Sequence, residues 1–158
     1  MKNILKNILF YAVICCSGMA TASYAQTLPN NGQITRQNDI KQLSSLWQAY
    51  QDTLVTMNQA LNGIKNETDE NQKNARIAIY TKKLEDTKNA LNRLVLTQVA
   101  ANQLRQQILE HATKYQNVYK LSAVSKPTEN QLNMFERLNV QTSMLYSQMQ
   151  ITAKTIIH

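Results

Sequence analysis

Few residues of this chain have the types and spacing that catalysis requires. His111 stands four residues before Tyr115, a spacing that brings both side chains to one face of a helix. The imidazole could act there as a base or as a pH sensor. Both residues also fall on an apolar stripe, which favours a packed or hydrogen-bonded core histidine. The other histidine, His158, has no neighbouring ligands in the sequence with which to hold a metal ion.

Acid–base catalysis needs two carboxyl groups whose environments separate their pKa values. No two carboxylates of this sequence are paired in an apolar setting. Glycine-rich phosphate loops, nucleophile elbows and zinc-protease motifs are absent from the sequence. Cys15 and Cys16 are the only cysteines. We therefore expect no enzyme, with no catalytic, cofactor-binding or metal-binding residue and no cofactor. The carboxylates that we expect to be solvated are Asp69, Glu70, Glu85, Asp86, Glu129 and Glu136.

Basic residues outnumber acidic ones, with 17 Lys and Arg against 10 Asp and Glu. The spacings from Lys82 to Asp86 and from Glu85 to Lys88 are typical of a solvated helix face. A surface for acidic partners is the alternative. No aromatic side chains interleave with these lysines, so we expect no nucleic-acid binding. The basic run consists of Lys73, Arg76, Lys82, Lys83, Lys88 and Arg93.

Residues 1–25 have the three parts of a secretory signal peptide. Lys2 and Lys6 precede an apolar run over 8–15, and Ser23-Tyr24-Ala25 is a small-x-small cleavage site. Cleavage after Ala22 is an alternative. A lipoprotein signal and an uncleaved anchor are less favoured, because Ile14 precedes Cys15 and the apolar run is shorter than the roughly 20 residues of a membrane span. We expect an exported protein without stable membrane insertion.

The part after residue 25 is expected to be helical, since the chain has only three Gly and two Pro with which to make turns. Residues 26–37 are predicted to be a flexible N-terminal arm, and residues 38–158 a single domain. Asn38 or Thr35 could cap the first helix, and Gly63 could end it in a left-handed conformation. Its heptad seam comprises Ile40, Leu43, Trp47, Tyr50, Leu54, Met57, Leu61 and Ile64.

The next segment has neither Gly nor Pro from Asp69 to Ala123. Its apolar register drifts near Gln98, so it is either one long helix or two helices broken near residues 97–102, and we favour continuity. Asp69 with Gln72 and Thr128 with Gln131 are predicted capping pairs. The seam residues of this segment are Ile77, Tyr80, Leu84, Leu91, Leu94, Leu104, Ile108, His111, Tyr115 and Val118.

The last helix is predicted to bury a stripe that two threonines weaken. Met134, Met144 and Ile151 are expected to widen this stripe on its flank, and an intermolecular surface is the alternative interpretation of these residues. The stripe comprises Leu132, Phe135, Leu138, Thr142, Leu145, Met149, Thr152 and Ile156. The predicted fold class is all-α, an elongated antiparallel helical bundle of three long helices, of which the central one is the segment that could be broken into two.

The leader, the Gln-rich start from Gln26, the long amphipathic helices and the lack of cysteine after residue 25 resemble the minor pilus component of bacterial type IV secretion systems. The resemblance is to the short, immunodominant surface-antigen member. Larger members carry a globular insertion after the first long helix, for which Asn62–Lys65 leaves no room. The resemblance implies a helical virulence-associated protein of the periplasm and cell surface that contacts pilin or other secretion-system subunits and host cells.

We therefore expect a secreted, non-catalytic interaction protein, a minor pilus or surface component that mediates assembly or host-cell contact. Self-association through the same stripes is a further expectation. The alternative is a periplasmic holdase-type chaperone, a basic helical rod that binds unfolded chains. A membrane-active helical toxin is disfavoured by the polar, Asn- and Gln-rich helix faces.

Overall fold

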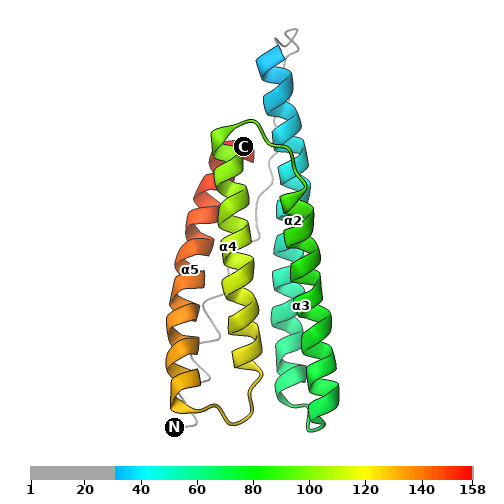
Figure 1. Ribbon diagram of the computed structural model, residues 1–158, viewed down its shortest axis with the longest axis vertical. Helices are drawn as coiled ribbons and strands as arrows, with labels where there is room; N and C mark the ends of the chain where they lie inside the picture. Colours follow the sequence, from blue (N-terminus) through cyan, green and yellow to red (C-terminus); the bar gives the residue numbers. More distant parts are fainter. Residues whose placement is uncertain (1–30, 158) are drawn as a thin grey trace.

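The computed structural model describes residues 31–157, with side chains from residue 35 onward (Figure 1). The expected signal peptide, residues 1–25, and the first part of the expected arm, residues 26–30, lie outside these described residues. The described chain is helical, without strands, and its helices are α2 (Asn31–Lys65), α3 (Glu70–Asn92), α4 (Val99–Ser122) and α5 (Glu129–Ile157). The all-α prediction is confirmed.

The four described helices run up and down along the long axis of the molecule, each antiparallel to the next (Figure 1). The 35 residues of α2 correspond to a rod of about 53 Å. The most extensive contact joins α4 to α5, and α2 and α4 each contact all three other described helices. The chain is therefore a four-helix bundle in which α2 and α4 occupy the central positions.

The heptad seam of α2 supplies a large part of the hydrophobic core. Leu43, Tyr50 and Met57 have no exposed surface, and Ile40 is partly buried against the same cluster. The seam pattern predicted this because side chains at alternating spacings of three and four residues stay on one side of a helix. The other buried seam residues are Trp47, Leu54, Leu61 and Ile64.

The prediction of one continuous central helix is wrong. The chain leaves the helix at Arg93, which caps α3, and α4 begins at Val99. Side chains replace the backbone hydrogen bonds that the break removes: Arg105 donates to the Leu94 carbonyl at 2.9 Å, and Asn102 donates to the Leu96 carbonyl at 3.0 Å. A chain can leave a helix without Gly or Pro when the carbonyls of the segment that follows find such partners.

Both ends of α2 differ from the prediction. The helix begins at Asn31, so residues 31–37 of the expected flexible arm are helical, and neither Asn38 nor Thr35 starts it. Gly63 lies within the helix, which continues to Lys65 because Ile64 remains a buried core residue. The favourable packing of Ile64 outweighs the left-handed turn that Gly63 would permit.

The two predicted capping pairs are confirmed. Asp69 accepts hydrogen bonds from the backbone amides of Asn71 at 2.8 Å and Gln72 at 3.3 Å, and so begins α3. Thr128 and Gln131 bond reciprocally, at 2.9 and 3.3 Å, at the start of α5. These caps fix where the second helix of each hairpin begins.

Candidate functional site

A cluster of aromatic rings surrounds the buried side chain of His111. The hydroxyl oxygen of Tyr50 lies 2.5 Å from Nδ1 of His111. The imidazole stacks on Tyr115, with ring centroids 5.7 Å apart, and meets Tyr146 at 5.5 Å. Tyr146 stacks in turn on Trp47 at 6.2 Å. The cluster thereby joins α2, α4 and α5 through rings that contact one another.

The electrostatics of this cluster keep it uncharged at neutral pH. Burial lowers the pKa of His111 to about 4, and a hydrogen bond that its ring donates to the Thr142 backbone opposes part of that shift. Burial also raises the pKa of Tyr50 well above its usual range, and the nearby phenols of Tyr115 and Tyr146 add to this effect. The prediction of a packed, hydrogen-bonded core histidine is thus confirmed, because His111 is buried and its ring is hydrogen-bonded to Tyr50.

A second buried polar group holds the connection between α3 and α4. Asp39 on α2 is 2 % exposed, and its Oδ2 accepts hydrogen bonds from the Thr97 amide at 2.7 Å, the Thr97 hydroxyl at 3.1 Å and the Gln98 amide at 2.8 Å. Gln98 is the N-cap residue of α4 but makes no side-chain cap bond. Asp39 therefore anchors, from another helix, the two residues that precede α4, and it places a carboxylate near the positive end of that helix.

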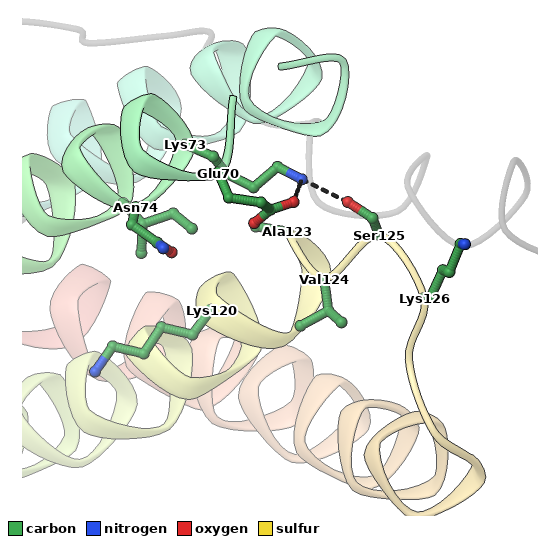
Figure 2. A pocket seen from close by; sticks show the side chains of 9 residues that line it. Glu70, Lys73, Asn74, Lys120, Ala123, Val124, Ser125 and Lys126 are labelled. Atoms are coloured by element: carbon green, nitrogen blue, oxygen red, sulfur yellow. Dashed lines mark hydrogen bonds and ion pairs between the residues drawn. The ribbon is translucent and has the colours of Figure 1, made fainter. Parts of the chain in front are cut away.

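A hollow of about 680 Å³ opens where the first turn of α3 meets the loop after α4 (Figure 2). At its edge the Lys73 ammonium, only 2 % exposed, donates to Glu70 at 3.0 Å and to the Ser125 hydroxyl at 2.5 Å. Figure 2 shows that Lys120 and Lys126 extend away from this group. The lysines do not converge on a common point, so the arrangement ties α3 to the α4–α5 loop.

The basic run therefore divides into two kinds of residue. Lys73 is buried and structural, contrary to the expected solvated face. The pairs Lys82–Asp86 at 3.3 Å and Lys88–Glu85 at 2.9 Å are confirmed. Surface pairs of this kind contribute about 0–1 kcal/mol each. The basic run thus includes exposed lysines that form ion pairs on the surface of α3, and one buried lysine, Lys73.

A smaller hollow of about 220 Å³ lies at the other end of the bundle, between the start of α2 and the end of α5. Its charged groups are Arg36 and Asp39, and the Asp39 carboxylate is already bonded to the α4 cap. Within residues 31–157 no group of His, Asp and Glu side chains is placed to hold a metal ion. None of the helices in the same range is both long enough and apolar enough to cross a bilayer.

Exposed apolar side chains gather on α5. Val140, Met144 and Ile151 are 58, 62 and 68 % exposed, and with Ser147 they fall within about 60° of one another around the helix. We call these four residues the outer α5 face. It points away from the core, because the buried residues of α5 lie on the opposite side of the helix. Those buried residues are Thr142, Leu145, Met149, Ala153 and Ile156.

The prediction that Met144 and Ile151 lie on the flank of the buried stripe is wrong. At 100° per residue, Met144 is turned by about 140° from the buried side and Ile151 by about 160°. Met134 is also exposed, at 45 %, but on a different side of α5. Sequence reasoning missed Val140, although its spacing of four residues from Met144 could have revealed the face.

The chain matches no protein-family model, no curated protein and no solved structure. We therefore choose the candidate functional surface from the exposure and position of its side chains. Of the two hollows and the outer α5 face, the face presents the most exposed large apolar side chains, since Val124 in the larger hollow is only 37 % exposed.

Proposed function

We propose that this protein is a non-catalytic, exported interaction protein, a minor pilus or surface component of a bacterial type IV secretion system that mediates assembly or host-cell contact. The observation that carries the proposal is the outer α5 face, an uncharged apolar stripe on a helix whose other side is buried. Interface centres are depleted of charge and enriched in residues such as methionine.

The sequence between Leu138 and Ala153 supports this proposal, because it contains no Asp, Glu, Lys or Arg. Each of the other described helices carries one exposed large apolar residue, which is Val55 on α2, Ile79 on α3 and Val99 on α4. The composition of residues 1–25 supports export, and the resemblance to minor pilus components supports the cellular setting. The polar groups described above are engaged in holding helices together, which favours binding over chemistry.

The test is co-purification from envelope fractions of the bacterium that makes the protein. The wild-type chain is expected to recover pilin or secretion-channel subunits. Met144→Glu places a charge at the centre of the outer α5 face and is expected to lower that recovery at least about tenfold. Ile79→Glu is the matched control, since Ile79 is 57 % exposed on α3, away from the face.

Equal recovery by the wild-type chain and the Met144→Glu variant would show that α5 is not the binding surface. Recovery of neither pilin nor channel subunits by any variant would overturn the assignment to a secretion system. Circular dichroism at increasing temperature checks that all three proteins are equally folded. Antibody labelling of intact cells gives a second readout, because a pilus-associated chain is accessible at the surface.

A further inference from the structure

Three charged residues lie nearest the outer α5 face, and two of them, Glu136 and Lys154, are arranged symmetrically about it. The midpoint of the face falls between Leu145 and Tyr146, and Glu136 and Lys154 lie at nearly equal distances on either side of it. At 100° per residue both project about 50° to the same flank of the face. Both are exposed, and neither has an ion-pair partner within residues 35–157.

We propose that the outer α5 face binds a second copy of this chain, with the two α5 helices antiparallel across a two-fold axis near Leu145 and Tyr146. This deepens the proposed function by naming one occupant of the same surface. It rests on that proposal only in taking the outer α5 face to be a protein-binding surface.

The register of such a pair follows from the positions on the helix. A two-fold axis through the midpoint sets Val140 of one copy opposite Ile151 of the other, and Met144 opposite Ser147. Because this two-fold axis is perpendicular to the plane of the two helices, each flank of one copy lies beside the same flank of the other copy. Glu136 of one copy therefore meets Lys154 of the other, and the symmetry makes this pair twice.

The remaining charge close to the face fits the same arrangement. Arg137 projects to the opposite flank, where the antiparallel register places it beside Thr155 of the second copy and not beside Lys154. In a parallel pair the two-fold axis runs along the helices and exchanges the flanks, so Glu136 would lie beside Arg137 of the second copy and Lys154 would have no acidic neighbour. The charges thus fit a second copy of this chain as the occupant, and the antiparallel register is the one that engages both Glu136 and Lys154, as the Lys154→Glu variant tests.

A contact built on one helix from each copy is small, so we expect a reversible dimer. Sedimentation equilibrium of the purified protein over a wide concentration range is expected to fit a monomer–dimer equilibrium. Glu136→Lys and Lys154→Glu each turn two attractive pairs into two repulsive ones and are expected to weaken the dimer about tenfold. Met144→Glu is expected to abolish it, and Ile79→Glu to leave it unchanged.

The decisive result comes from mixing the two charge-reversal variants. Neither is expected to self-associate well, but together they restore both opposite-charge pairs and form a mixed dimer. The double variant E136K/K154E is likewise expected to recover wild-type association. These variants change only exposed residues, and circular dichroism confirms that each is folded.

A protein that stays monomeric at the highest concentration reached would overturn the proposal. So would single charge reversals that associate like the wild type, or variants that fail to pair when mixed. The proposed function fails separately: a monomeric protein that still recovers secretion-system subunits through Met144 keeps that function and loses only the dimer.

Discussion

The hydroxyl of Tyr50 on α2 lies 2.5 Å from Nδ1 of His111 on α4, and this bond joins the two central helices of the bundle inside its core. Both side chains are buried, at 0 and 3 % exposure. A polar bond in such a place restricts how the helices can slide past one another, since any other register leaves a buried donor or acceptor without a partner.

The stability of the fold is expected to fall in mildly acidic solution because of His111. Burial lowers its pKa to about 4 from the ordinary 6.5, so the unfolded chain binds a proton more readily between these pH values. The free energy of unfolding contributed by this group is complete above pH 6.5 and is lost as the pH falls toward 4, by about 3 kcal/mol in all.

Urea unfolding at pH 7 and pH 5 measures this dependence. His111→Leu is the matched variant, because it removes the titrating group while keeping an apolar side chain in the core. The wild type should lose about 2 kcal/mol between the two pH values, and the variant clearly less. Equal losses in both proteins would assign the acid sensitivity to the carboxylates.

Removing the Tyr50 hydroxyl is expected to destabilise the protein. Tyr50→Phe leaves Nδ1 of His111 buried without a donor, which costs about 1–3 kcal/mol in thermal or urea unfolding. Tyr119→Phe is the control, since the buried hydroxyl of Tyr119 has no hydrogen-bond partner among the described residues. The control is expected to be neutral or stabilising, and a loss as large as that of Tyr50→Phe would contradict this description of the core.

The junction between α3 and α4 is expected to depend on Asp39. Asp39→Ala removes the acceptor of both the Thr97 and the Gln98 amide, and the cost is about 1–3 kcal/mol. Hydrogen exchange should show faster exchange of these two amides and of the first turn of α4, while the far ends of the helices stay protected. Asp52→Ala, on the exposed face of α2, provides the control.

The Lys73 contact predicts a different pattern. Ser125→Ala removes one of the two partners of the buried ammonium and should cost about 1–2 kcal/mol. Lys73→Met removes the buried charge together with its need for partners, so it should be close to neutral or stabilising. Urea unfolding of the two variants compares them, and a larger loss for Lys73→Met than for Ser125→Ala would show that the ammonium has a role beyond this contact.

What the sequence predicted well was local. The α2 seam from Leu43 to Ile64 and the caps at Asp69 and Thr128 depend on residues within a few positions of one another, where helix geometry alone fixes the outcome. The burial of His111 beside Tyr115 follows from the same spacing. These features needed no knowledge of how the helices pack.

What the sequence did not predict depends on distant partners. The break after Arg93 is held by Asp39, which lies 58 residues before Thr97, and the burial of Lys73 depends on Ser125, 52 residues later. The drift of the apolar register near Gln98 was the only local signal of the break. A continuous helix also has favourable local energetics, so tertiary hydrogen bonds decided between the two alternatives.

The prediction for the α5 surface fails for a related reason. Residue type alone groups Met144 and Ile151 with the apolar stripe, whereas their angles place them opposite Met149. Val140 completes the group that the structure leaves exposed. Angular position around the helix, and not hydrophobicity alone, separates a core stripe from a binding face.

The proposed function requires the outer α5 face to bind other proteins of a secretion system. A photo-crosslinking amino acid at position 144, compared with one at position 79, tests it in the living bacterium. We expect crosslinks from position 144 to pilin or secretion-channel subunits, in addition to any to a second copy of the chain. We expect none of these crosslinks from position 79. If position 144 gave no crosslinks to such subunits, or if both positions gave equally strong crosslinks, the outer α5 face would not be the binding surface.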